Sequence, residues 1–438
     1  MTLFDIIAQW TVFVLVAITL MLRRQVTLFH PTTFYLVFHA IVFCLRPTLV
    51  WALDFDTVFL YMQFHPSHEV LRSTLMVSSL ALVVFCGTFS LVCTSTVIGE
   101  AGEQPTITPG MRKAFWAMAL IVAPLGFYSV TAQDISGVHV RGVYVLTGGS
   151  SGYVNDLQQV FVSLVVMFAL VMRWRWYSFI PLLFFIYYRA GEGHARWMMI
   201  YPVFFLVLTY LWERRKKIPP LRILLPMPLL LFLFTNLTHD RWFVHRWIQG
   251  DEFVAPLMDN EYMSFKDRWD TMDFANFDFL AFVIDTVPEK TRGYNYGAQH
   301  LQIFTEPIPR ALWRGKPIGA PVTLVDWNRF GNTLGITTSV VGDGWISYGW
   351  LGVMVNMLLY GTGLALLYNW FVLHQTHVYR GLIALLIFSI LVQVFRDGSF
   401  VTIAKFLLFT MFPILLWWVF HKVLFPDEIE EVDEVKTL

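Results

Sequence analysis

The chain of 438 residues is strongly apolar, because 56% of its residues are hydrophobic and only 14% are charged. Soluble globular proteins average about 25% charged residues, so this chain lacks the polar surface that a soluble fold needs. Its 31 basic and 31 acidic residues cancel, which gives no support to nucleic-acid binding. We therefore predict an all-α polytopic membrane protein.

The sequence contains no sign of a disulfide framework or of a metal site. Its three cysteines, Cys44, Cys86 and Cys93, all lie in apolar runs. The zinc-binding patterns CxxC and HExxH and the phosphate-loop pattern GxxxxGK[ST] are absent. We expect no cofactor and no metal.

Long apolar segments predict the membrane spans. A hydrocarbon core about 30 Å thick needs about 20 apolar residues per helix. By that measure the chain has eleven spans, of which the sixth and seventh are short and closely joined. The spans are expected near 4–22, 33–53, 74–95, 114–131, 154–172, 177–189, 197–212, 221–237, 344–371, 381–395 and 400–421.

The spans divide the chain into four parts. Residues 1–237 hold the first eight spans, 238–343 form one large extracytoplasmic loop, and 344–421 hold the last three spans. A loop that long is more than a connection. The last part, 422–438, is an acidic cytoplasmic tail, of which Pro426–Leu438 is expected to be disordered.

Basic residues mark alternate short loops, and such residues accumulate on the cytoplasmic side of a membrane. The rule places the N-terminus and the large loop outside and the C-terminus inside. The basic residues are Arg23 and Arg24, Arg112 and Lys113, Arg173 and Arg175, Arg214 to Lys217, Arg380 and Lys422.

Charge is sorted along the large loop. Residues 238–289 contain eleven acidic and four basic residues, whereas 290–316 contain five basic residues and one acidic residue. Between these charged parts, Asp273–Thr286 is apolar and aromatic but is interrupted by three aspartates. It is too short and too charged to span, so we predict a helix lying at the outer membrane interface.

The turn between the sixth and seventh spans collects charged residues. Arg189, Glu192, His194 and Arg196 lie together on the outward side, where an ionisable residue usually faces a cavity or a partner. Arg196 also begins a helix, and the positive end of its dipole suits an anion. The alternative is a tight hairpin whose arginines snorkel and pair with Glu192.

The segment Lys290–Pro317 mixes basic and aromatic residues. Arginine forks pair with phosphate oxygens, lysine supplies a point charge, and aromatic faces stack on sugar rings. Ligand binding is favoured over a basic loop that lies on lipid headgroups or pairs with the acidic part. The residues concerned are Arg292, His300, Arg310, Arg314 and Lys316 among Tyr294, Tyr296 and Trp313.

Three further positions carry charge near the outer ends of spans. Arg396–Gly398 joins the last two spans and either caps the bundle or adds to a site. Asp343, between two glycines at the entry to the ninth span, is a candidate general base or a bare acidic turn. Arg46 precedes Pro47 in the second span, where it either snorkels at a kink or faces a cavity.

Several outward arginines without a metal or nucleotide motif suit a reaction on a lipid-linked phosphate. Arginines stabilise the negative charge that develops on a diphosphate leaving group. A carboxylate or histidine nearby removes the proton from the acceptor hydroxyl of a sugar.

With these residues the chain resembles the Wzy-type O-antigen or oligosaccharide repeat-unit polymerases, which share a GT-C-like membrane fold with the O-antigen ligases. The resemblance rests on the turn Gly191–Arg196, on Pro307–Pro317 followed by Gly335–Ser339, and on Arg396–Gly398. His194 and Glu192 in the first turn depart from the pattern, which leaves the general base open.

The resemblance implies transfer of a growing glycan from undecaprenyl diphosphate to a lipid-linked repeat unit, on the periplasmic face of the bacterial inner membrane. Its partners would be this lipid-linked oligosaccharide, membrane lipids and a chain-length-regulating co-polymerase. By the resemblance, Arg196, Arg314 and Arg396 would hold the lipid diphosphate, with the substrate-binding residues Arg310 and Lys316 in support. The residues themselves add His300 and Asp343 as catalytic candidates, and Arg189, Glu192, His194, Arg292, Tyr294 and Asp397 as substrate-binding candidates.

Two other functions remain open at this stage. A ligase would hand the glycan to lipid A core, and one sequence does not separate the two acceptors. A transporter or flippase for the same lipid-linked sugar would need charges and broken helices near mid-membrane and two matching halves. It is disfavoured, because the charges crowd the outer mouth and the sequence shows no half-repeat.

Overall fold

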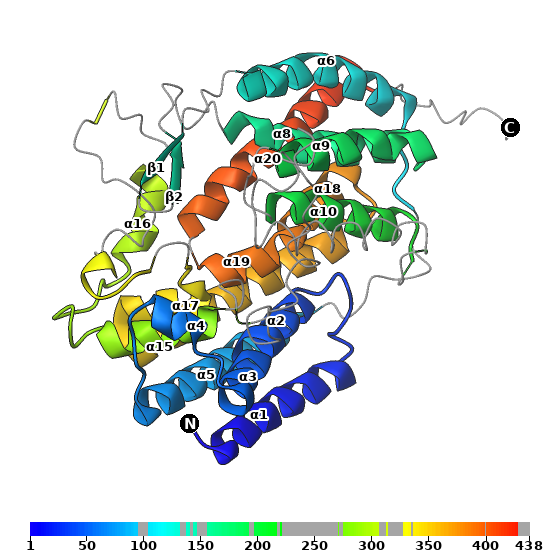
Figure 1. The fold of residues 1–438 in the computed structure, drawn as a ribbon. Helices are drawn as coiled ribbons and strands as arrows, with labels where there is room; N and C mark the ends of the chain where they lie inside the picture. Colours follow the sequence, from blue (N-terminus) through cyan, green and yellow to red (C-terminus); the bar gives the residue numbers. More distant parts are fainter. Residues whose placement is uncertain are drawn as a thin grey trace, which may run out of the picture.

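The computed structural model describes residues 1–94, 104–131, 137–140, 143–146, 156–191, 197–216, 220, 270, 275–305, 312–313, 327–333, 336–398 and 400–427 (Figure 1). The expected span 221–237 and the acidic tail beyond residue 427 lie outside these residues. So do most of the loop 238–274 and the segment 314–326.

The chain is a helical multi-pass membrane protein. Within the described residues, seven helices are long and apolar enough to cross a membrane. Three further expected spans form shorter helices. Apart from helices, the described part contains one small β-hairpin. The seven are Leu3–Leu22, Pro31–Leu53, His68–Val92, Pro109–Val130, Ser339–Leu373, Val378–Asp397 and Phe406–Val423.

The elements of the first part of the chain follow the expected spans closely. The small antiparallel hairpin, β1 (Gly137–Val140) with β2 (Val143–Leu146), was not anticipated from the sequence. The helices are α1 (Leu3–Leu22), α2 (Pro31–His39), the π-helix η1 (Ala40–Leu45), α3 (Arg46–Leu53), α4 (Thr57–Tyr61), α5 (His68–Val92), α6 (Pro109–Thr131), η2 (Leu157–Gln159), α8 (Val160–Val171), η3 (Trp176–Phe179), α9 (Ile180–Gly191) and α10 (Trp197–Glu213).

The remaining helices come from the large loop and the last spans. They are α15 (Asn276–Thr286), α16 (Ala298–Thr305), η6 (Trp327–Arg329), α17 (Ser339–Leu373), α18 (Val378–Ser389), α19 (Leu391–Asp397) and α20 (Phe400–Val423).

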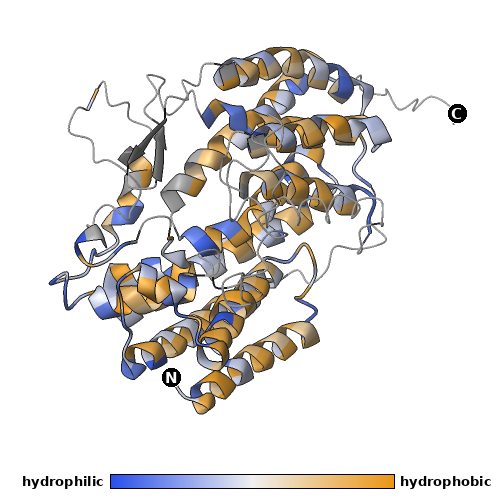
Figure 2. Cartoon of the chain, in the orientation of Figure 1, coloured by the Kyte–Doolittle hydropathy of each residue, from blue (hydrophilic) through white to orange (hydrophobic). Residues whose placement is uncertain are grey.

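The helices form two groups that meet along α18, α19 and α20 (Figure 1). In the first group, α5 packs against α1, α15 and α17, and α19 packs against α2 and α17. In the second group, α20 packs against α6 and α8, and α10 packs against α8 and α18. Apolar residues also cover the outer faces of the helices (Figure 2), such as Phe4 and Leu120, which are 75% and 76% exposed. Such faces suit contact with lipid.

The basic loops lie at one end of the bundle, which we call the basic end. Hydrogen bonds and ring contacts between helix termini bring the ends of α1, α5, α8, α10, α17 and α20 and the starts of α6 and α18 together there. The N-terminus of the chain lies at the opposite end, where it contacts His68. The contacts join Arg23 to Ser90, Thr94 to Asn369, Trp174 to Glu213, Arg215 to Gln375, Trp417 to Met111 and Tyr379 to Trp417.

Helix α17 is a hairpin of two arms and not one straight helix. Tyr348 and Gly349 have non-helical backbone angles, with φ values of −167° and +57°. The side-chain amide of Asn356 donates to the carbonyl of Val340 over 2.8 Å. In one continuous helix these two residues would lie about 24 Å apart. The short arm, residues 339–347, therefore folds back along the long arm, residues 350–373.

The helix predicted at the membrane interface is instead packed inside the first group. It begins at Asn276, and its side chains from Phe277 to Val283 are 0 to 1% exposed. It lies against α5 and α17. The difference arises because its central aspartate has a buried partner in the second span, which the apolar pattern alone does not reveal.

That partner is Arg46, which is 1% exposed. Its guanidinium donates to both carboxylate oxygens of Asp278, over 2.8 and 3.1 Å. A third ion, Asp270, lies 2.6 Å from Nη1 of Arg46 and accepts a hydrogen bond from the backbone of Thr57. Of the two alternatives for Arg46, snorkelling to water is wrong, because the arginine binds a helix of the large loop.

We expect Arg46→Ala to lower the free energy of unfolding by about 3–5 kcal/mol, because it leaves two buried carboxylates without their cation. Unfolding in mixed detergent micelles measures the change. The matched control is Arg72→Ala, since Arg72 is 67% exposed and lies 3.7 Å from Asp5. An exposed pair contributes no more than about 1 kcal/mol. Equal losses in the two variants would contradict the role of the buried cluster.

The hairpin of α17 predicts a disulfide. Val340→Cys combined with Asn356→Cys should cross-link on oxidation, because the two positions are in contact across the arms. The control pair, Asn356→Cys with Asn369→Cys, lies on one arm about 20 Å apart and should stay reduced. Non-reducing mass spectrometry of peptides distinguishes these results, and a reduced first pair would rule out the hairpin.

Candidate functional site

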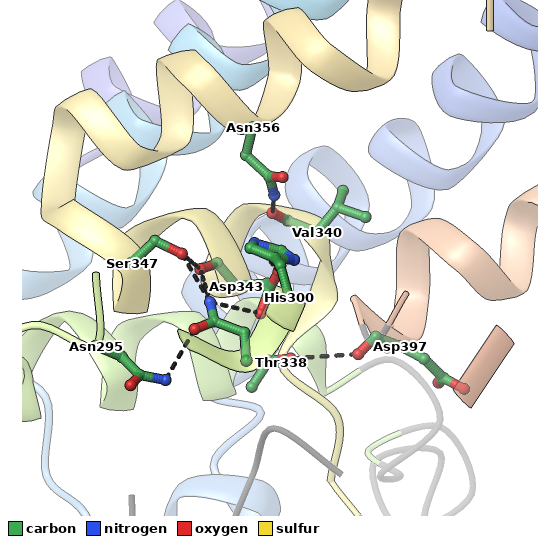
Figure 3. Close-up of polar contacts among 9 residues, drawn as sticks. Asn295, His300, Thr338, Val340, Asp343, Ser347, Asn356 and Asp397 are labelled. Atoms are coloured by element: carbon green, nitrogen blue, oxygen red, sulfur yellow. Dashed lines mark hydrogen bonds and ion pairs between the residues drawn. The ribbon is translucent and has the colours of Figure 1, made fainter. Parts of the chain in front are cut away.

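The short arm of α17 carries Asp343 into a polar cluster (Figure 3). The carboxylate is 3% exposed. The amide nitrogen of Gln299, on α16, donates to Oδ1 of Asp343 over 3.1 Å and to Oγ of Ser347 over 2.7 Å. Gln299 in turn accepts a hydrogen bond from Asn295 over 2.8 Å. One oxygen of Asp343 is thus held in place, and the other is left to face His300.

His300 is the partly accessible member of this cluster. Its Nε2 lies 3.4 Å from Oδ2 of Asp343, and its side chain is 38% exposed. Burial lowers the pKa of His300 below its ordinary value of 6.5. A neutral imidazole with its Nε2 proton directed at the carboxylate has an unprotonated Nδ1. This arrangement is that of a general base oriented by a buried acid.

The turn Arg396–Gly398 packs onto the start of the same short arm. Oγ1 of Thr338 donates to the carbonyl of Asp397 over 3.2 Å. Gly398 has a φ of +69°, and a Cβ there would lie 2.3 Å from the carbonyl oxygen of Ser339. Only glycine allows this approach. The backbone of this turn therefore lies against Thr337, Thr338 and Ser339, four to six residues before Asp343 in the sequence.

The amide of Asn276, on α15, ties the two segments together. It donates to the carbonyl of Thr337 over 2.8 Å and to the carbonyl of Arg396 over 2.9 Å. Arg396 itself is partly exposed. The carboxylate of Asp397 accepts a hydrogen bond from Gln393 over 2.5 Å. The backbone carbonyls of Arg396 and Asp397 thus lie against Thr337 and Thr338, just before the short arm.

Two further candidates lie in the segment that leads into α16. Tyr294 packs over Gly349 at the tip of the hairpin. Arg292 is exposed and has a φ of +60°. Tyr294 therefore lies at the tip of the hairpin, and Arg292 lies on the surface two residues before it.

Arg189 does not join this cluster. It is 0% exposed within the second helix group, where its guanidinium donates to Oε1 of Gln158 and to Sδ of Met198, each over 2.8 Å. It also lies 5.6 Å from the centre of the Phe185 ring. Its neighbours in the proposed anion-binding turn, Glu192, His194 and Arg196, lie outside the described residues, as do Arg310, Arg314 and Lys316.

Sequence reasoning missed Gln299, Asn276 and the carboxylate partner of Arg46. Neutral amides carry no charge signal, so nothing in the sequence distinguished Gln299 or Asn276. The ion pair had a signal, because an arginine in one apolar helix and an aspartate in another both need partners. No group of three metal-binding side chains occurs in the described part of the chain.

Comparisons with models of known protein families, with curated proteins and with solved structures find no match to this chain.

Because burial lowers the pKa of His300, its imidazole should stay neutral at pH values where an ordinary histidine is half protonated. The rate of carbethoxylation, which needs the neutral ring, should fall with a midpoint below pH 6.5. Mass spectrometry reports the modified peptide, with exposed His65 as the internal check on the reagent. A midpoint at or above 6.5 for His300 would contradict the buried environment.

Proposed function

We propose that the chain is a membrane glycosyltransferase of the Wzy type, which polymerises oligosaccharide repeat units carried on undecaprenyl diphosphate. The observation that supports this most is the Asp343–His300 pair beside the Arg396–Gly398 turn. In this proposal the pair supplies the base, and Arg396 in the neighbouring turn supplies the cation. Both are needed when a hydroxyl displaces a diphosphate.

In the proposed reaction, Nδ1 of His300 takes the proton of the acceptor hydroxyl. The hydroxyl oxygen then attacks the anomeric carbon of the donor sugar, and the bond from that carbon to the diphosphate oxygen breaks. Asp343 keeps the ring oriented and stabilises the imidazolium that forms. Arg396 offsets the charge on the departing diphosphate, with Arg196 and Arg314 proposed to assist. No nucleotide is needed, since the sugar–diphosphate bond stores the energy, and the reaction is proposed to be metal-independent because arginines carry the countercharge.

The position of the site supports activity on the outer face. Gly344, next to Asp343, lies against Val353 of the long arm, about 30 Å from the end of α17 at Leu373. Leu373 belongs to the basic end, which the positive-inside rule assigns to the cytoplasm. The site would then lie at the outer edge of a hydrocarbon core about 30 Å thick. In a bacterial inner membrane this edge is periplasmic, and lipid-linked diphosphates reach it.

A transporter of the same lipid-linked sugar is the second candidate, and one observation favours it. Nε2 of His39 lies 3.2 Å from the amide nitrogen of Gln9, which also donates to Ser78 over 3.2 Å. All three residues are buried, and the π-helix Ala40–Leu45 follows directly. His39 lies about 12 Å along its helix from Pro31 at the basic end, near mid-membrane. Buried polar groups at that depth are typical of transport pathways.

Purified protein incubated with lipid-linked repeat units, without nucleotide or metal, should form longer oligomers and release undecaprenyl diphosphate. His300→Gln should slow the reaction by about 100-fold or more, because it removes the base. Wild-type activity should also fall as the pH drops through the lowered pKa of His300, since protonation occupies Nδ1. The matched control is His65→Gln, which changes an exposed histidine and should leave the reaction at the wild-type rate.

Two outcomes would identify an alternative function, and a third tests two of the proposed arginines. Bare translocation in vesicles without longer oligomers would identify a transporter. Transfer only when lipid A core is supplied would identify a ligase. Wild-type oligomer lengths in Arg196→Ala and Arg314→Ala would remove those arginines from the proposed site. A chain-length-regulating co-polymerase is the expected partner and would shift the length distribution.

A further inference from the structure

Three tyrosines gather at the tip of the α17 hairpin, beside the Asp343–His300 pair. The ring centroids of Tyr294, Tyr296 and Tyr348 lie 5.4 to 6.5 Å from one another. Tyr296 is 73% exposed and Tyr348 is 49% exposed. We call these three residues the tyrosine platform. It offers a broad aromatic surface with several hydroxyl groups at one place.

Backbone hydrogen bonds attach the tyrosine platform to the short arm of α17, which also carries Asp343, the partner of His300. The amides of Asn295 and Tyr296 donate to the carbonyls of Ile346 and Ser347, over 2.9 and 3.0 Å. Ser347 lies one helical turn from Asp343, so the platform begins about 6 Å along the arm from the carboxylate. The platform and the base therefore have a fixed relative position, about one sugar ring apart.

The local backbone is strained where it presents these rings. Tyr296 has a φ of +51°, which is an uncommon conformation for a bulky residue. Such strain persists only where the surroundings impose it, and it clusters at binding sites. Burial raises the pKa of Tyr294, and its neighbours Tyr348 and Tyr296 raise it further, as expected for phenol groups that face one another.

The chemistry of the platform fits a sugar ring. The face of an aromatic ring is negative, so it attracts the weakly positive C–H groups on the apolar face of a pyranose. The hydroxyls of tyrosine can bond the sugar hydroxyls at the rim. Aromatic residues that only anchor a protein in the membrane are distributed around its circumference. Here three converge on one point next to a general base.

We propose that the tyrosine platform is the acceptor subsite, which stacks on the sugar ring whose hydroxyl His300 deprotonates. This inference rests on the proposed glycosyltransferase function and deepens it. It assigns roles to Tyr296 and Tyr348 as substrate-binding residues and makes the platform specific for the acceptor and not for the lipid diphosphate of the donor.

Donor-only and acceptor-only substrates test the assignment. The donor is a lipid-diphosphate repeat unit capped at its non-reducing end, and the acceptor is the same uncapped repeat unit on an alkyl chain without diphosphate. Tyr348→Ala and Tyr296→Ala should raise the KM for the acceptor about 10-fold and leave the KM for the donor within 2-fold. The Phe variants, which keep the aromatic face, should stay within about 3-fold of wild type.

The control is Tyr128→Ala, because Tyr128 is 61% exposed on α6, away from the platform. Equal rises in both KM values, or Phe variants as weak as the Ala variants, would overturn the acceptor subsite. If the wild-type protein forms no product from any donor, the proposed function fails, and the platform is judged by a binding measurement instead.

That measurement is lactoperoxidase iodination of the full chain in nanodiscs, read by mass spectrometry. Methyl hexopyranosides and methyl N-acetylhexosaminides at tens of millimolar should protect Tyr296 and Tyr348 at least 3-fold and leave Tyr128 unchanged. Absence of protection by every glycoside would overturn the proposal. Full protection in lipid before any sugar is added would also overturn it, since it would assign the platform to the membrane interface.

Discussion

The buried ion cluster of Arg46, Asp278 and Asp270 is the interaction on which the outer end of the protein depends. An arginine inside an apolar bundle is costly unless its charge is paired and its hydrogen bonds are satisfied. The second span can therefore keep Arg46 only if α15 enters the bundle and supplies Asp278. Two residues earlier, the same helix offers Asn276 to the carbonyls of Thr337 and Arg396. Charge pairing at one point thus positions the segments that form the candidate site.

The α17 hairpin is the second constraint, because it makes a polar site possible at the edge of the membrane. A straight span would place Asp343 beyond the helices that surround it. The return of the short arm sets Asp343 against the long arm, where Gln299 satisfies one oxygen and His300 faces the other. Irregular backbone at this depth is tolerated only when it is covered by protein or lines a cavity. Here Tyr294 lies against Gly349, and the amides of Asn295 and Tyr296 donate to the carbonyls of Ile346 and Ser347.

The sequence alone predicts features that depend on a single segment and misses those that depend on contacts between distant segments. Apolar length predicted the seven spans of the described part, because lipid contact acts on each helix separately. It did not predict the hairpin, since a break of two residues, Tyr348 and Gly349, leaves the hydropathy continuous. It misplaced α15, whose partner Arg46 lies 232 residues from Asp278 along the chain. His300 and Asp343 were each identified from their chemistry, and only the fold showed that they are paired.

The distribution of charge now has a physical explanation. Cations in short loops collect at the basic end, where they remain hydrated, and most need no buried partner there. At the opposite end Arg46, Asp343 and Arg189 are buried, and each is held by a specific contact: Arg46 by two aspartates, Asp343 by an amide, Arg189 by a glutamine and a thioether. Groups held in this way are already desolvated and oriented before a substrate arrives, which is the condition under which charge interactions contribute most to a transition state. Zero net charge across the chain conceals this asymmetry between its two ends.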